Sequence, residues 1–483
     1  MDRRQFLAFS TAIAGIALLP RCATSQPSAP TSTLYRSQAG LLEVDLTAQL
    51  TSVPLAGRTA QLMTYNQQVP GPRLEVNPGD RVQIRFTNRL DQPTNLHFHG
   101  LHVDPTGLAD NPFRVVNPNE TVDYIFDIPV DHPAGLFWYH PHYHGLVAQQ
   151  LSSGLAGEFI VRGPDERLPA LQSAQEAVLV LQDFDLNRQG QVREPMPMAR
   201  MWGREGDLIT ANGQANPTLP LAHGGLLRLR LLNASASRFY RLQLQNHPWW
   251  LMATDGGILQ APIAQEEVLL SPGERVDMLV PGDQPPGTYP LVTLPYDRGL
   301  ADMMAGMTDR HGGHPSMGSL GQTEPLPIAQ VNYGAPGTAV DWPETLGTVD
   351  PLPEPTTTRE FVLDHGLDPE TGDQFLINGR AFGHHRVDVQ VNVGTVEDWV
   401  IINRAGMDHS FHLHTNPFQV VARNGQPEPL KAWKDVVNVP AYETATIRIA
   451  FRQFVGKTVY HCHMLDHEDQ GMMGIVEMLD IKK

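Results

Sequence analysis

The chain has 483 residues, of which 42 are glycine, 41 are proline and 18% are charged. This composition favours many short strands joined by turns over long helices, and the length allows two to four domains. The formal net charge of −17 argues against nucleic acid and against anionic membrane surfaces as partners.

Residues 1–33 are predicted to form a targeting segment and a flexible leader that lie outside the fold. Arg3 and Arg4 precede a mostly apolar run over 8–20, which resembles a twin-arginine signal for proteins exported in the folded state. Lipid attachment at Cys22 is disfavoured because the two residues before it are not small. We therefore expect an exported, periplasmic protein without an integral membrane span, since no later apolar run approaches roughly 20 residues.

Three stretches repeat one pattern along the chain. Residues 79–88, 224–233 and 394–403 each begin with glycine, alternate like a strand, and end with asparagine nine positions later. About 30 to 40 residues after each asparagine comes another turn and alternating strand, beginning at Asn119, Gly273 and Tyr442. A repeat of this length predicts three copies of one β domain, each a β-sandwich or Greek-key barrel, and hence an all-β chain.

The repeat sets the expected domain boundaries. Domain one is predicted over 34–165, domain two over 174–295 and domain three over 356–483. Domain two lacks closely spaced histidine pairs and is expected to be a spacer without metal ligands that sets the geometry of the two outer domains. The stretch 296–355, rich in proline, glycine, methionine and histidine, is expected to be a linker loop that is either functional or disordered.

Domain one carries two pairs of histidines separated by one residue. His97 and His99 form the first pair, and His140 and His142 form the second. In an extended strand the two members of a pair share one face. Two pairs in one domain indicate a metal site, and His144, which follows the second pair, is interpreted as a supporting residue.

Domain three repeats this arrangement with His412 and His414. His409 stands three positions before that pair, where it is free to serve a different metal ion. Among the remaining histidines, His223 and His247 of domain two are isolated and are interpreted as ordinary surface or core residues.

The C-terminal stretch adds a cysteine between two histidines, His461-Cys462-His463, followed by His467 and Met472. Trigonal His₂Cys with a weak axial methionine is the ligand set of an electron-transferring blue copper centre. In an extended strand Cys462 faces away from both neighbours. The cysteine can therefore hold one copper ion while its neighbours hold others, only a few bonds away.

These four histidine-bearing stretches together resemble the multicopper oxidase family, the laccases, cuprous oxidases and their relatives, over nearly the whole chain after the leader. The resemblance implies three cupredoxin domains and four copper ions. It assigns the type 1 copper to His409, Cys462, His467 and, axially, Met472, and the type 2 copper to His97 and His412. It assigns one type 3 copper to His99, His140 and His463, and the other to His142, His414 and His461.

The resemblance also implies a reaction. A substrate would give up single electrons at the type 1 copper, and four electrons would pass through Cys462 to the three-copper cluster, where O₂ becomes two waters. Glu468 matches the cluster-side acid of the family, and Asp110 is the candidate acid beside the type 2 copper; either could instead be a solvated loop residue. The expected partners are O₂ and a small-molecule or metal-ion reductant, and the chain is expected to act as a monomer.

The reductant is left open by the sequence. Met303, Met304, Met307 and Met317 are soft thioethers that favour Cu(I), and they resemble the methionine-rich insertions of cuprous oxidases that serve copper homeostasis; a flexible polar loop is the alternative. Phenolic or aromatic donors, Cu(I), or both form the leading hypothesis, and Fe(II) or Mn(II) the second. A non-enzymatic copper-binding or cell-division-type structural protein is the third, although such relatives lose cluster ligands and this chain retains every one.

Overall fold

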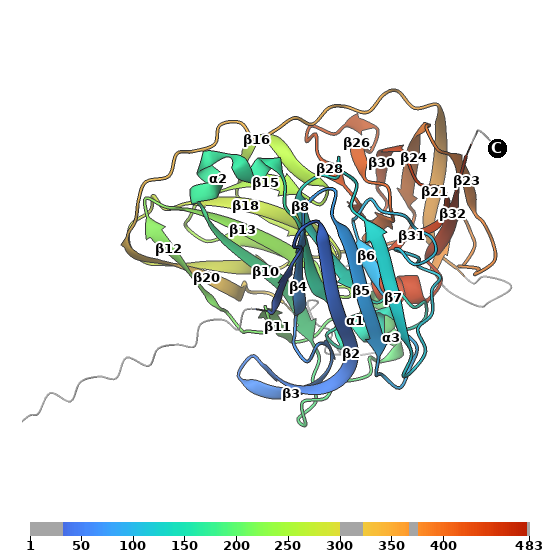
Figure 1. Cartoon of the computed structure of the whole chain (residues 1–483), viewed down its shortest axis with the longest axis horizontal. Helices are drawn as coiled ribbons and strands as arrows, with labels where there is room; N and C mark the ends of the chain where they lie inside the picture. The colour runs from blue at the N-terminus through green and yellow to red at the C-terminus, as the bar shows by residue number, and fades with distance from the viewer. Residues whose placement is uncertain (1–31, 300–321, 367–374, 481–483) are drawn as a thin grey trace, which may run out of the picture. The chain divides into compact units, whose positions relative to one another are not determined.

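The computed structural model describes residues 32–299, 322–366 and 375–480, all within a unit that begins at Thr31. In these residues the strands form sheets that pair off along the chain into three two-layered sandwiches. Figure 1 shows the three groups by colour, blue to cyan, green to yellow, and orange to red. The predicted all-β class with three domains is therefore confirmed.

The first sandwich is built from two sheets whose apolar faces meet in one core. One sheet has the order β1 (Leu34–Arg36), β4 (Gly71–Val76), β9 (Gly157–Val161), β8 (Gly135–His140) and β6 (His97–His99). The other has the order β3 (Arg58–Tyr65), β2 (Leu41–Leu55), β5 (Arg81–Asn88) and β7 (Thr121–Asp127). In β5, Val82, Ile84 and Phe86 alternate inward, as a half-buried strand requires.

The second sandwich has a larger first sheet. Its order is β11 (Leu208–Ala211), β10 (Gln175–Phe184), β13 (Leu226–Asn233), β18 (Arg275–Pro281), β15 (Trp249–Thr254) and β16 (Gly257–Gln265). The other sheet has the order β12 (Thr218–His223), β20 (Leu326–Pro336), β19 (Thr288–Leu294), β14 (Tyr240–Leu244) and β17 (Val268–Leu270).

Strand β20 corrects the expected boundary of domain two. The sequence prediction placed residues 326–336 in a linker, whereas β20 pairs with both β12 and β19. Ile328, Ala329 and Val331 are buried in the core of the second sandwich, and that burial is the physical reason for the strand. The second sandwich therefore continues well beyond residue 295.

The third sandwich begins at Thr357. One sheet has the order β22 (Phe375–Ile377), β21 (Thr357–His365), β24 (Val396–Asn403), β30 (Thr444–Ala450), β26 (Phe418–Arg423) and β27 (Gln426–Pro427), with β28 (Trp433–Lys434) also on β26. The other has the order β23 (Val389–Asn392), β32 (Met473–Leu479), β31 (Gly456–Cys462), β25 (His409–Leu413) and β29 (Val436–Val439).

The repeated glycine-to-asparagine stretches occupy the same place in each sandwich. They form β5, β13 and β24, each parallel to the preceding long strand and antiparallel to a later one. Each final asparagine is buried and closes the next turn: the side-chain oxygens of Asn88, Asn233 and Asn403 accept from the backbone N–H two residues on. The repeat in the sequence thus reflects one strand and one asparagine-closed turn that recur in all three sandwiches.

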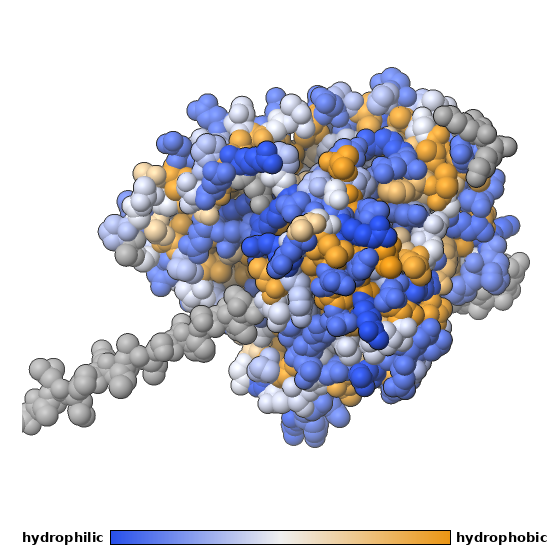
Figure 2. Space-filling view, in the orientation of Figure 1, coloured by the Kyte–Doolittle hydropathy of each residue, from blue (hydrophilic) through white to orange (hydrophobic). Residues whose placement is uncertain are grey.

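A few short helices accompany the strands of the described residues. They are α1 (Val147–Ser152), the 3₁₀ turn η1 (Pro164–Arg167), α2 (Pro169–Ser173), α3 (Pro197–Trp202) and α5 (Leu465–Asp469). None of the described helices has the length and hydropathy needed to cross a membrane. Figure 2 shows a mainly hydrophilic face with apolar areas over β5 and β7 of the first sandwich.

Candidate metal centres

The first candidate centre, called here the Cys462 site, joins His409, Cys462 and His467. These residues come from β25, the end of β31 and α5. The Sγ of Cys462 lies 3.5 Å from Nδ1 of His409 and 3.8 Å from Nδ1 of His467, and the two nitrogens are 3.3 Å apart. All three side chains are fully buried. Three soft or borderline ligand atoms at the corners of a triangle are what a blue copper centre requires.

Burial controls the chemistry of the cysteine. It raises the pKa of the Cys462 thiol to about 12, so a bound metal ion must displace a proton to form the thiolate. The backbone N–H of Met464 points at Sγ over 3.4 Å. Met472 is buried in the same core, and its carbonyl oxygen accepts from the N–H of Cys462 over 3.0 Å. Its role as an axial ligand remains a prediction.

The second candidate centre, called here the histidine cluster, lies between the first and third sandwiches. Antiparallel pairing places His97 opposite His140 in β6 and β8, and His412 opposite His461 in β25 and β31. Rings from the two sandwiches stack, His97 on His414 at 3.7 Å and His99 on His412 at 3.8 Å between centroids. The full set, none more than 2% exposed, is His97, His99, His140, His142, His412, His414, His461 and His463.

Four of these eight histidines have Nδ1 tied to a neighbouring oxygen. The Nδ1 atoms of His140, His412 and His461 hydrogen-bond to the carbonyl oxygens of Pro141, Asp435 and Cys462. The Nδ1 of His97 hydrogen-bonds to the Asp110 carboxylate. Each such bond fixes the tautomer and leaves Nε2 as the free nitrogen.

The free nitrogens converge as metal ligands would. The Nε2 atoms of His142 and His414 lie 3.2 and 3.1 Å from Nε2 of His461. The Nε2 atoms of His97 and His412 are buried without a hydrogen-bond partner. Burial lowers the pKa of the cluster histidines, to about 4 for His142 and His461, so their rings are neutral and able to bind metal. The donor set therefore fits copper ions, while their division among three ions remains a prediction.

Both predicted acids lie at the histidine cluster. Asp110 accepts from the N–H of Phe98 over 2.9 Å as well as contacting His97. Glu468 lies 3.1 Å from Nδ1 of His461 and 3.4 Å from Nε2 of His142. Burial raises the pKa of Asp110 to about 8 and that of Glu468 to about 7. Neither is a solvated loop residue.

The second sandwich also reaches the histidine cluster, although none of the eight histidines of the cluster comes from it. Its loop before β18 places Gly273 against the ring of His463, where any Cβ would crowd three ring atoms. Arg275, at the start of β18, forms a bidentate ion pair with Asp435 of the third sandwich. Although burial raises the pKa of Asp435 to about 6, it is ionised at neutral pH. No local sequence signal marks either residue.

Sequence reasoning also missed the surroundings of His467. The Phe375 ring stacks on His467 at 4.0 Å, and Nε2 of His467 donates to the carbonyl oxygen of Met201 in α3 over 3.2 Å. A helix of the second sandwich therefore covers the imidazole edge of the Cys462 site.

Beside His409, Tyr296 donates to the Asp408 carboxylate over 2.6 Å. The methionine group Met303, Met304, Met307 and Met317 lies outside the described residues.

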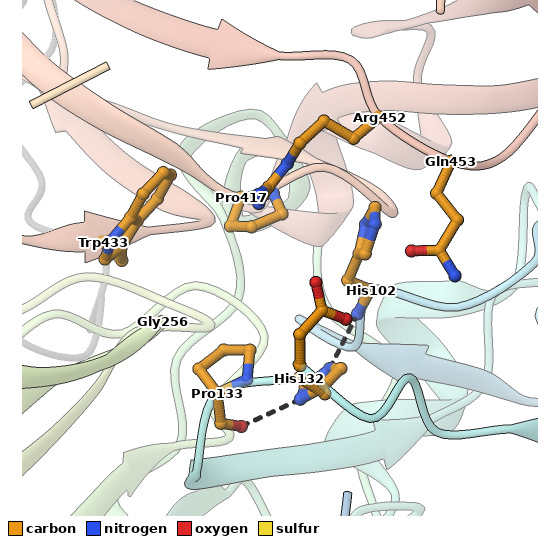
Figure 3. Close-up of a pocket in the computed structure, with 9 residues that line it drawn as sticks. His102, His132, Pro133, Gly256, Pro417, Trp433, Arg452 and Gln453 are labelled. Atoms are coloured by element: carbon orange, nitrogen blue, oxygen red, sulfur yellow. Dashed lines mark hydrogen bonds between the residues drawn. The ribbon is translucent and has the colours of Figure 1, made fainter. Parts of the chain in front are cut away.

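A pocket of about 240 Å³ opens where the three sandwiches meet. In Figure 3, His132 lies between His102 and Pro133, while Arg452 and Gln453 approach from the third sandwich. His102 is tied to the carbonyl oxygen of Thr415 over 2.7 Å, directly after the cluster residue His414. The pocket thus adjoins the histidine cluster without containing any of its members.

Comparisons with known proteins agree on one family. Three multicopper oxidase family models match residues 47–166, 138–310 and 353–480. The chain is 31% identical over 492 residues, 98% of each chain, to a cell division protein FtsP of Yersinia pestis.

Two solved structures are similar over nearly their whole length. One is a multicopper oxidase of Campylobacter jejuni described as a metallo-oxidase, with a TM-score of 0.81, 30% identity, and coverage of 92% of this chain and 94% of that one. The other is a laccase of Pediococcus acidilactici, with a TM-score of 0.78, 27% identity, and coverage of 94% of both chains.

Proposed function

Because the chain belongs to the multicopper oxidase family, we propose that it oxidises a reducing substrate at the Cys462 site and passes the electrons to O₂ at the histidine cluster. The observation that supports this proposal is that Cys462 joins two buried groups of candidate metal ligands. The side chain of Cys462 belongs to one group, and its chain neighbours His461 and His463 lie among the rings of the other.

The one-electron chemistry is expected where the thiolate and imidazole side chains bind copper. Copper, when bound by the thiolate and imidazoles, would supply the one-electron steps. The polypeptide supplies the connection, because Sγ of Cys462 is linked to both flanking histidines through a few covalent bonds. Four substrate molecules would each give up one electron, and one O₂ would take up four electrons and four protons to give two waters.

The chain also supplies protons. Burial raises the pKa of Asp110 and of Glu468 into the neutral range, so each carboxyl group can take up and release a proton near neutral pH. Both oxygens of Glu468 are buried, and the carboxyl group lies against two cluster histidines. A proton held there can be delivered at the cluster without crossing bulk water.

Phenolic or aromatic donors, Cu(I), or both are the proposed substrates. Because α3 covers the edge of His467, a donor would approach the Cys462 site across this helix. Two exposed methionines flank that approach, Met196 at 71% and Met198 at 43% exposure, and thioethers favour Cu(I). The likeness to a metallo-oxidase of Campylobacter jejuni supports Fe(II) or Mn(II) as the alternative.

A second candidate function follows from the likeness to FtsP, the cell division protein. In that case the chain would bind a partner and would not turn over O₂. The buried free nitrogens of the histidine cluster favour the oxidase, because a purely structural role gives no reason to leave them without partners.

Oxygen uptake by copper-loaded protein tests the oxidase. We expect uptake with a phenolic donor or with chelated Cu(I), at one O₂ per four electrons, and no uptake after Cys462→Ser. A variant with Ser at Met303, Met304, Met307 and Met317 should lose only Cu(I) oxidation if these residues admit Cu(I). Absence of uptake with every donor, despite full copper loading, would reject the oxidase and leave the cell-division role.

Export is proposed from the twin-arginine-like signal at Arg3 and Arg4. Replacing both arginines by lysine should retain the chain in the cytoplasm. Fractionation of cells that express each form would measure this directly, and equal export of both forms would contradict the proposal.

A further inference from the structure

We propose that Arg275 of the second sandwich and Asp435 of the third act as positioning residues that make Nδ1, rather than Nε2, the metal-binding nitrogen of His99. The inference rests on the proposed function only in taking the histidine cluster to bind copper. It gives the second sandwich a direct part in building a centre to which it contributes no histidine.

The guanidinium of Arg275 has every donor engaged. Its two terminal nitrogens donate to the two Asp435 oxygens, over 2.6 Å to Oδ1 and 2.7 Å to Oδ2. The other three donors reach backbone carbonyl oxygens, those of Leu136, Gly273 and Asp255, over 2.9, 3.2 and 2.9 Å. These partners belong to all three sandwiches. With five donors satisfied and 1% exposure, the side chain has one orientation.

Asp435 transmits that orientation to His99. Its Oδ1 lies 3.0 Å from Nε2 of His99. A carboxylate paired with a guanidinium only accepts hydrogen bonds, so Nε2 must carry the hydrogen. The lone pair of His99 is then on Nδ1, which lies 3.4 Å from Nε2 of His140, the nitrogen that His140 offers to the cluster.

Asp435 also orients His412, but there it leaves Nε2 rather than Nδ1 as the nitrogen available to metal. The main-chain oxygen of Asp435 accepts from Nδ1 of His412 over 2.7 Å, which leaves Nε2 of that ring free. One residue therefore orients two stacked rings, His99 and His412, and directs a different nitrogen of each toward metal. Because both carboxylate oxygens of Asp435 already pair with Arg275, the side chain acts as an orienting group and not as a ligand.

Gly100 supplies independent support. It follows His99 with φ of +85°, and a Cβ at this position would collide with the guanidinium of Arg275 and the carboxylate of Asp435. Glycine is thus required where the chain leaves His99, because the ion pair packs directly on its backbone. The backbone that carries His99 therefore packs directly against the two residues, Arg275 and Asp435, that orient its ring.

Copper binding by Asp435→Asn and Arg275→Met tests the proposal in the full chain. We expect each variant to keep the blue band of the thiolate-bound copper, while copper affinity at the histidine cluster falls about 10- to 100-fold, as for lost orienting partners elsewhere. Total copper per chain and the electron paramagnetic resonance signal of the cluster measure the loss. Arg275→Lys, which keeps the charge, should retain part of the binding.

Asp277→Asn is the matched control, because Asp277 forms a similarly buried ion pair with Arg228 inside the second sandwich. If this control loses as much cluster copper as Asp435→Asn, the effect is general destabilisation and the proposal is wrong. Unchanged cluster copper in both Asp435→Asn and Arg275→Met also overturns it. Since copper binding is the readout, failure of loaded wild-type protein to consume O₂ would reject only the proposed function.

Discussion

His132 is a buried histidine of the first sandwich that borders the three-domain pocket and belongs to neither candidate centre. Its Nδ1 donates to the carbonyl oxygen of Pro133 over 2.8 Å, and its Nε2 accepts from the backbone N–H of His102 over 3.0 Å. That pair of bonds requires the neutral ring. Burial accordingly lowers the pKa of His132 to about 4.

We predict that His132 makes the protein sensitive to acid. Between about pH 6.5 and about pH 4 the unfolded chain binds a proton at this residue while the folded chain does not, so stability falls as the pH drops across this range. The loss should reach roughly 3 kcal/mol. Urea unfolding of metal-free wild type and His132→Gln at neutral and acidic pH measures it, and equal acid sensitivity of the two proteins would contradict the assignment.

At the scale of the element, the asparagine that ends each repeated strand ties two segments together. Asn233 accepts from the N–H of Ser235 and donates to the carbonyl oxygens of Arg238 and Leu270, all within 3.0 Å. Since the side chain is fully buried, its removal leaves backbone groups without partners.

We predict that Asn233→Ala lowers the free energy of unfolding by roughly 3 kcal/mol, because orphaned buried groups cost about 1–3 kcal/mol each and partial relaxation recovers some of the loss. Denaturant unfolding gives the value. Gln260→Ala, at an exposed position of β16, is the control and should change stability by less than about 0.5 kcal/mol. A similar cost for both would show that the asparagine bonds contribute little.

Helix α5 carries His467 and Glu468 between two anchoring carboxylates. Asp466 pairs with Arg204 of the second sandwich over 2.8 Å, and Asp469 accepts from the N–H groups of Gly145 and Ala148 of the first sandwich over 2.7 and 2.9 Å. Five residues of helix thus connect three sandwiches, and the ligand His467 is placed by contacts on either side of it.

We predict that Asp466→Asn weakens copper binding at the Cys462 site by about tenfold, in line with the loss of other supporting partners, while the histidine cluster stays loaded. Competition with a chelator, followed through the blue band, measures the affinity. The control is Asp185→Asn, which breaks an exposed ion pair with Arg193 in the second sandwich and should leave the copper affinity of the Cys462 site unchanged. Equal affinities in Asp466→Asn and wild type would assign the Arg204 pair a purely structural role.

At the scale of the whole molecule, the sequence predicts what is local and misses what the fold brings together. The histidine pairs are separated by one residue, so strand periodicity alone places both members on one face. Asp435 contacts His99 across 336 positions, and no pattern in either segment signals that contact. Strand β20 was missed for a related reason, since one of its two partner strands, β12, lies over 100 residues earlier.

The last prediction concerns copper as a connection between sandwiches. The histidine cluster draws its ligands from the first and third sandwiches, so copper bound there stabilises only the assembled arrangement. Free copper at 100 times its dissociation constant would add about 2.7 kcal/mol, and chelation should lower the unfolding temperature accordingly.

Cys462→Ser tests where that stabilisation arises. The Cys462 site draws its ligands from the third sandwich alone, so this variant should keep most of the copper-dependent rise in unfolding temperature. His412→Ala removes a cluster residue that stacks on His99 of the first sandwich, and it should lose most of the rise. Differential scanning calorimetry with and without a chelator measures both. If Cys462→Ser alone abolished the rise, the stabilising copper would lie within one sandwich, and the histidine cluster would not connect two of them.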